Sequence, residues 1–176
     1  MRENLQLKTL NDEGYFTGYA SIFNVVDNQG DKILQGAFRD TLRDEGAGIK
    51  LLWQHAMSEP IGLFTLLRED ARGLYVEGRL LLDVQRAKEA YSLLKAGAIA
   101  GLSIGYVPVE YYREPQTGVR VLEKVRLYEI SLVTFPANAQ ATVQAVKSDW
   151  GAEIRTGEFI RLSNALDYAI HALRFP

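Results

Sequence analysis

The chain has 176 residues, with 20 lysines and arginines against 22 aspartates and glutamates, and it contains no cysteine. This length predicts one domain with a short appendage, and the lack of cysteine excludes thiolate catalysis and cysteine-based zinc sites. A net charge of −2 without a basic stripe argues against nucleic-acid binding, and without a signal core or an apolar run of about 18 residues we expect a soluble, intracellular protein.

The first half of the chain reads mainly as strands. The hydrophobic pattern predicts strands over 5–10 and 15–23, a loop over 24–31, a helix over 37–44, and strands over 49–55, 61–68 and 73–82. We place the turn before the strand over 61–68 at Ser58-Glu59-Pro60. In the loop, Asp27 and Asp31 lack the ligand spacing of a calcium site, so we interpret them as turn residues.

The second half contains the clearest helix, over 84–95, with Asp83 as its N-cap and Gly97 just past its end. Its apolar stripe is Val84, Ala87, Tyr91 and Leu94. Strands follow over 100–112, 118–126, 127–134 and 141–147, with a hairpin turn at 115–118. This order predicts an α+β fold in which a closed or partly closed β-barrel, mostly antiparallel, has helices packed around it.

The last segment, 149–176, is predicted to be an amphipathic helical tail. Its apolar residues recur at helical spacing: Phe159, Leu162, Leu166, Ile170 and Leu173. Such a stripe must be buried against something. It either docks on its own barrel or across a dimer, or it binds a partner protein.

Three polar side chains in apolar surroundings are candidates for nucleophilic catalysis. Ser103 lies between Gly101 and Gly105, His55 ends an apolar run, and Glu129 interrupts another. A serine needs a neighbouring base, which histidine supplies near neutral pH, and a carboxylate can orient that base. Strand parity turns Ser103 and Glu129 away from the core toward a shared surface.

Each of these residues also has a structural interpretation. A serine between glycines is usually a site of close packing, and a histidine at a strand end is usually a surface residue. A carboxylate in an apolar strand is commonly paired with an arginine, here Arg126. The residues alone leave both interpretations open.

The segment Gly101-Leu-Ser-Ile-Gly105 also matches the nucleophile elbow of α/β-hydrolases. That elbow requires a strand before the serine and a helix after it, whereas here a helix precedes Ser103 and Pro108 follows within strand. It would also need a histidine after the serine, which leaves only His171 in the tail. We therefore reject the elbow.

Eight ordered segments resemble the prohead proteases of tailed phages, the serine peptidases that mature procapsids. These segments are Gly18-Tyr-Ala-Ser-Ile-Phe-Asn-Val-Val-Asp27, Gly30-Asp31, Gly36-Ala-Phe38, Leu51-Leu-Trp-Gln-His55, Glu59-Pro-Ile-Gly62, Gly73-Leu-Tyr-Val-Glu-Gly78, Gly101-Leu-Ser-Ile-Gly-Tyr106 and Glu129-Ile-Ser-Leu-Val-Thr-Phe-Pro-Ala-Asn138. The family is similar in fold to the herpesvirus capsid maturation protease. We therefore expect a prohead protease domain over 1–148, followed by the tail. If the tail binds a partner protein, the resemblance implies that this partner is scaffold or capsid protein and that the tail carries the chain into the assembling particle.

The resemblance implies Ser103 as nucleophile, His55 as base and Glu129 as the third catalytic residue. Many relatives carry an acidic residue after the histidine, where this chain has Ala56, which favours Glu129. The oxyanion donors stay open among the amides near Gly101 or Gly105, Arg120 and Arg126.

The family also implies the biological setting. The expected substrate is the scaffold or scaffold-like N-terminal region of the major capsid protein, together with the protease itself. The expected place is inside the procapsid in the host cytoplasm. We expect a homo-oligomer, such as a dimer, with no cofactor, metal, nucleic acid or membrane. The alternative is a non-catalytic assembly or scaffolding component that keeps the barrel.

Overall fold

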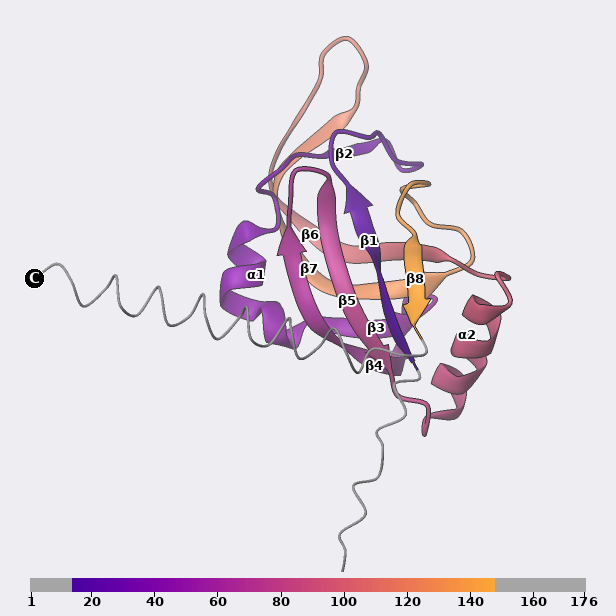
Figure 1. Ribbon diagram of the computed structural model, residues 1–176. Coiled ribbons are helices and arrows are strands. Elements are labelled where there is room, and N and C mark those ends of the chain that lie inside the picture. The colour runs from indigo at the N-terminus through magenta and orange to yellow at the C-terminus, as the bar shows by residue number, and fades with distance from the viewer. Residues whose placement is uncertain (1–13, 148–176) are drawn as a thin grey trace, which may run out of the picture. The chain divides into compact units, whose positions relative to one another are not determined.

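The computed structural model describes residues 14–147 (Figure 1). Its elements are β1 (Tyr15–Ile22), β2 (Asp31–Ile33), α1 (Arg39–Glu45), a 3-10 turn (Gly46–Gly48), β3 (Lys50–Trp53), β4 (Ala56–Glu69), β5 (Gly73–Leu80), α2 (Gln85–Lys95), β6 (Gly101–Arg113), β7 (Arg120–Val133) and β8 (Val143–Lys147). The predicted strand over 5–10 and the tail helix lie outside the described residues.

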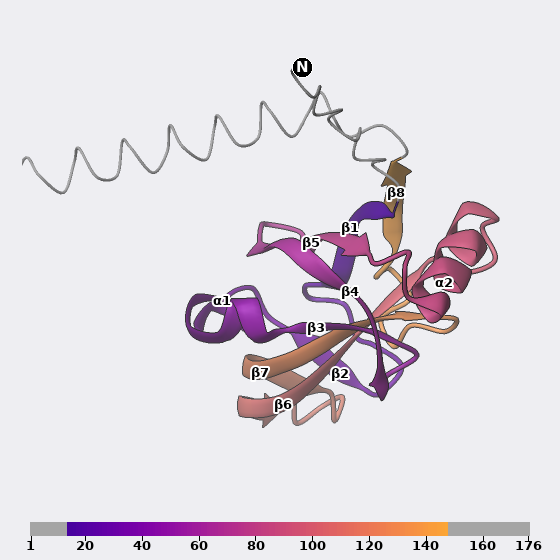
Figure 2. The ribbon, with the colours of Figure 1, turned by 90° about the horizontal axis from the view of Figure 1, so that it is seen from below.

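One mixed sheet forms the body of the described part. Its strand order is β2-β7-β3-β4-β5-β1-β8, and β6 pairs with β7 off this path. The pairings of β7 with β2 and β3 are parallel, whereas β6–β7, β3–β4, β4–β5 and β1–β5 are antiparallel. Figures 1 and 2 show that this sheet curls, with α1 and α2 on opposite sides of it. The expected strand-rich, curled architecture is present, and two α-helices accompany it within residues 14–147.

One hydrophobic core joins the strands of the sheet to both helices. Its largest fully buried side chains come from most strands and from the start of α1: Phe16, Phe38, Leu51, Ile61, Leu74, Leu80, Leu102, Leu122, Leu127, Ile130 and Leu132. Burying a side chain of this kind stabilises the fold by roughly 1.5–3 kcal/mol before entropy is counted. Strand β7 contributes Leu122, Leu127, Ile130 and Leu132. Because these side chains are buried, they hold the β7 backbone in place, together with the neighbouring polar residues Glu129 and Ser131.

Helix α2 buries most of the predicted stripe, but it begins one residue later than expected and Val84 is exposed. Ala87, Ala90, Tyr91 and Leu94 are buried along one face. The prediction of Asp83 as N-cap was wrong, because Val84 occupies that position and no side chain caps the helix. At the other end Gly97 has φ of +69°, a conformation that glycine adopts without strain, and it ends the helix as predicted.

Two boundary predictions in the sheet were wrong. Ser58-Glu59-Pro60 is not a turn, because β4 already begins at Ala56, and the turn before it is Gln54–His55. Pro60 fits in a strand because the pairing with β3 shifts register there. The strands predicted over 118–126 and 127–134 are one continuous strand, β7. Its pairing with β6 shifts register at several points along its length. The three-residue strand β2 was not predicted.

Candidate active site

Strand β7 brings two neighbouring strands into register at its C-terminal end. Residues Glu129–Leu132 pair with β3 on one side and with β6 on the other. Ser131 lies directly opposite Ser103 of β6, and Glu129 lies opposite Gly105. Directly opposed residues point to the same face of a sheet, with Cβ atoms about 4.5–5.5 Å apart. Ser103, Glu129 and Ser131 therefore share one face, in agreement with the predicted strand parity.

The turn between β3 and β4 brings His55 to this face. Its two residues, Gln54 and His55, have φ of 51° and 61°. Positive φ costs a residue with a Cβ atom roughly 1–2 kcal/mol, and such turns usually contain Asn-Gly. Two bonds to β7 hold the turn in place. The Gln54 N–H donates to Leu132 O at 3.0 Å, and the His55 N–H donates to the Ser131 hydroxyl at 3.1 Å.

The His55 ring, Glu129 and Ser131 form one hydrogen-bonded chain. Nδ1 of His55 lies 2.6 Å from Oε1 of Glu129, and the Ser131 hydroxyl donates to Oε2 at 2.6 Å. Because an ionised carboxylate can only accept, Nδ1 carries the proton. The lone pair of the neutral ring is then on Nε2. The side chains are 44% exposed for His55 and 13% for Glu129, so the base can reach solvent while the carboxylate is held inside.

The carboxylate changes the acidity of the imidazole. The hydrogen bond with Glu129 raises the pKa of His55 above its ordinary value, partial burial acts against this, and the charge of Glu129 raises the pKa further. This protonation behaviour is typical of a histidine oriented by an acid. The imidazolium form is therefore stabilised at the point in a reaction where it would appear.

Ser103 lies one strand further from His55. Its residue is 6% exposed, and among the described residues its hydroxyl makes no hydrogen bond, including none to His55. The described part of the chain has no buried side-chain oxygen or nitrogen without a partner, so the Ser103 hydroxyl is within reach of solvent. Catalytic hydrogen bonds are often long in the absence of substrate. The described residues therefore leave the Ser103 hydroxyl without a side-chain or backbone partner.

Arg120 and Arg126, which were candidates for the oxyanion donor, each form an ion pair elsewhere. Arg126 pairs with Glu45 and not with Glu129, so the structural interpretation of Glu129 as half of that ion pair was wrong. Arg120 binds Asp31 through Nε and Nη2 at 2.7 and 2.6 Å. Neither guanidinium lies in the chain of contacts that joins His55, Glu129 and Ser131.

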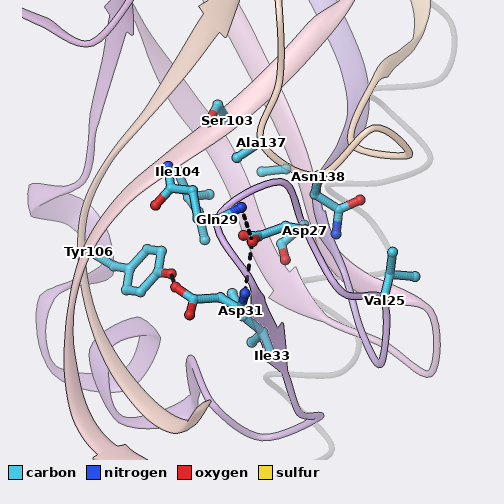
Figure 3. A pocket seen from close by; sticks show the side chains of 12 residues that line it. Val25, Asp27, Gln29, Asp31, Ile33, Ser103, Ile104, Tyr106, Ala137 and Asn138 are labelled. Carbon is cyan, nitrogen blue, oxygen red and sulfur yellow. Dashed lines mark hydrogen bonds between the residues drawn. The ribbon is translucent and has the colours of Figure 1, made fainter. Parts of the chain in front are cut away.

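Asp27 is a turn residue as predicted, whereas Asp31 begins β2 and its carboxylate is paired with Arg120. Oδ1 of Asp27 accepts the N–H groups of Gln29 and Asp31, which closes the loop on itself. Asp31 is 1% exposed and also accepts the hydroxyl of Tyr106 at 2.6 Å. Figure 3 shows this loop facing β6 across a small pocket that Ser103 and Tyr106 line from the other side.

Sequence reasoning missed two residues of the site. Ser131 lies two residues after Glu129 in a strand, so the parity that placed Glu129 also placed Ser131 on the same face. Gln54 anchors the turn through its amide, which donates to the Thr134 hydroxyl at 2.8 Å and accepts the Thr134 N–H at 3.3 Å. No sequence signal marks Gln54, because the turn was placed elsewhere.

Two further kinds of feature are absent from the described part of the chain. No helix there has the length and apolar character needed to span a membrane. Residues 14–147 also hold no group of three or more His, Cys, Asp or Glu side chains that could bind a metal ion.

Known sequences resemble this chain over most of its length. It is 39% identical over 144 residues to the prohead protease of Enterobacteria phage HK97, a match that covers 80% of this chain and 64% of that protein. It is 35% identical over 156 residues to the capsid polyprotein of Pseudomonas phage PAJU2, covering 82% of this chain and 22% of that protein. The chain thus spans less than two thirds of the length of these relatives.

A solved structure shares the fold. The capsid assembly protease of bacteriophage T4 matches with a TM-score of 0.55 at 12% identity, over 68% of this chain and 82% of that one. The protease of varicella-zoster virus matches with a TM-score of 0.48 at 15% identity, over 73% and 62%. The model of the caudovirus prohead serine proteases matches residues 3–153, and the chain therefore belongs to that family.

Proposed function

We propose that this chain is a serine endopeptidase that cleaves the scaffold or N-terminal scaffold-like region of a major capsid protein during procapsid maturation. Ser103 is the nucleophile, His55 the general base and Glu129 the group that orients the base. The observation that carries the proposal is the 2.6 Å contact between Nδ1 of His55 and Oε1 of Glu129. It fixes the tautomer with a free Nε2, which a base for a serine hydroxyl requires.

In the proposed reaction, Nε2 of His55 takes the hydroxyl proton as Ser103 attacks a peptide carbonyl. The imidazolium then gives this proton to the leaving amine, and an acyl-enzyme remains on Ser103. Water hydrolyses this ester with His55 again as base. Glu129 stays ionised throughout and stabilises the imidazolium. Since Arg120 and Arg126 are held by Asp31 and Glu45, backbone amides near Gly101 or Gly105 are the candidate oxyanion donors.

Ser103 and Ser131, which lie opposite each other on β6 and β7, could each be the nucleophile. Their environments favour Ser103. Ser131 is 0% exposed, and its hydroxyl proton is donated to Glu129. Attack by Ser131 would require it to give up that bond and to meet a substrate inside the sheet. Ser103 has an uncommitted hydroxyl within reach of solvent, on the same face.

The substrate is proposed from the relatives, which are named a prohead protease and a capsid polyprotein. In this proposal the chain works inside the procapsid, trims its own termini and needs neither a cofactor nor a metal. It forms a homo-oligomer, with a dimer as the simplest form. These expectations concern the whole protein and its partners. The co-expression experiment below tests the proposed substrate.

The test is co-expression with the neighbouring capsid gene, followed by mass measurement of the capsid subunit. The wild-type chain should shorten the subunit, and Ser103→Ala should leave it intact, because loss of a nucleophile typically lowers the rate about 10⁴–10⁶-fold. Ser92→Ala, which removes a surface hydroxyl from α2, is the control and should trim normally. Near-normal trimming by Ser103→Ala would reject this nucleophile. Normal particle assembly without any trimming by the wild-type chain would favour the non-catalytic assembly role.

A further inference from the structure

The hydroxyl of Ser131 has two partners, and both belong to the proposed catalytic apparatus. It donates to Oε2 of Glu129 at 2.6 Å and accepts the backbone N–H of His55 at 3.1 Å. The residue is 0% exposed, so neither water nor substrate competes for these bonds. One side chain therefore contacts both the orienting carboxylate and the residue that carries the base.

We propose that Ser131 is a positioning residue that holds the Glu129 carboxylate and the His55 turn in the geometry needed for proton transfer. This inference rests on the proposed function. Ser131 does not touch substrate; it acts through Glu129 and His55.

The first part of the argument concerns the carboxylate. Its two oxygens have different partners, since Oε1 faces Nδ1 of His55 and Oε2 faces the Ser131 hydroxyl. A carboxylate held at one oxygen only could rotate about its last bond, which is a soft torsion. The Ser131 bond removes that freedom, and Oε1 stays directed at the imidazole.

The second part concerns the turn. Gln54 and His55 both adopt a positive φ that residues with a Cβ atom avoid, so the turn keeps its shape only if contacts hold it. The Ser131 hydroxyl is the acceptor for the backbone N–H of His55 itself. Its loss would leave that N–H without this partner and let the ring move away from Glu129.

The test follows the protonation of His55 directly. The chain holds only two histidines, so in a His171→Gln background the single remaining imidazole is His55, and NMR titration reports its pKa. In the wild type, the bond with Glu129 raises this pKa. Ser131→Ala should move it back toward the ordinary value for histidine and lower kcat for capsid-protein trimming at least about tenfold, roughly 1.4 kcal/mol of barrier. KM should stay unchanged.

The control must remove a comparable buried hydroxyl that is bonded to β7 at another point. Thr41 serves, because its hydroxyl donates to Val125 O and accepts the Leu127 N–H of the same strand, and it is 5% exposed. Thr41→Val should lower the melting temperature without changing the His55 titration or kcat. If both variants change the titration equally, the effect of Ser131 is general loosening of β7 and the inference is wrong.

A double-mutant cycle separates positioning from a purely structural role. In a Glu129→Gln background, adding Ser131→Ala should change kcat and the His55 pKa far less than it does alone, since the carboxylate it positions is gone. Additive effects would overturn the inference, as would an unchanged titration and kcat in Ser131→Ala. Neither result would touch the proposed function, which is tested separately by trimming with the wild-type chain and with Ser103→Ala.

Discussion

A Cβ atom at Gly105 would lie 2.3 Å from Oε1 of Glu129, the oxygen that faces His55. Gly105 and Glu129 are directly opposed on β6 and β7, so the bare glycine makes the space that the carboxylate fills. In the sequence, Gly105 stands out only as a neighbour of Ser103. In the structure, it is close to Glu129 on the adjacent strand.

Gly105→Ala should therefore damage activity more than stability. The far end of a flexible side chain can yield to the new methyl group, so the fold should persist, but Oε1 must leave Nδ1 of His55. We expect capsid-protein trimming to fall at least about tenfold with a melting temperature within a few degrees of wild type. Gly46→Ala is the control, because φ there is −52° and a Cβ atom meets nothing within 4 Å. Full activity in Gly105→Ala would show that the observed carboxylate position is not required.

The role of His55 as a base determines the sign of the pH dependence, and its raised pKa determines where the activity declines. Only the neutral imidazole is a base, so trimming should decline as pH falls through a pKa that lies above the ordinary histidine value. Glu129→Gln removes the hydrogen bond and the charge that raise the pKa of His55. The acidic limb should then shift to lower pH while the plateau rate falls. Glu123→Gln, an exposed carboxylate on the same strand, should leave the profile unchanged.

His55→Ala should be inactive at every pH, and His171→Ala should keep the wild-type profile. His171 lies in the tail, outside the described residues. Rates of capsid-subunit trimming measured across pH would check both variants. An inactive His171→Ala with an active His55→Ala would revive the hydrolase-elbow interpretation.

The tail prediction can be tested by ending the chain at Lys147. If residues 149–176 only dock the protease onto scaffold or capsid protein, the shortened chain should stay soluble and cleave a peptide in trans. It should also be missing from purified procapsids. Aggregation would indicate that the predicted apolar stripe belongs to the folded core or to an oligomer interface. Normal incorporation into procapsids would reject the targeting role.

Local patterns predicted what is local in this structure. The stripe of α2, its end at Gly97 and the parity of Ser103 and Glu129 all follow from spacing along one element. Three contacts could not be predicted this way, because each joins residues 74 or more positions apart: Glu129 with His55, Arg120 with Asp31, and Arg126 with Glu45. The His55 turn was misplaced because Gln54 and His55 adopt a positive φ without the asparagine or glycine that normally signals it.

The ion pair between Asp31 and Arg120 should contribute more to stability than any other arginine pair on β7. Asp31 is 1% exposed, and Arg120 and Tyr106 together hold its carboxylate with three hydrogen bonds. Arg120→Ala would leave a buried charge without its main partner, which typically costs about 3 kcal/mol or more. Arg126→Ala removes an exposed pair with Glu45 and should hardly change the denaturation midpoint.

Acid should weaken the same pair in a defined direction. Burial would raise the pKa of Asp31, but hydrogen bonds from Arg120 and Tyr106 outweigh it and hold the pKa below its usual value. A carboxyl group with a lowered folded-state pKa stabilises the protein fully above its unfolded pKa of about 3.9, and this contribution is lost as pH falls through the lower folded value. The destabilisation caused by Arg120→Ala in urea should therefore be largest near neutral pH and shrink below about pH 4. A difference from wild type that stays constant down to pH 2 would mean that Arg120 stabilises the fold by packing alone.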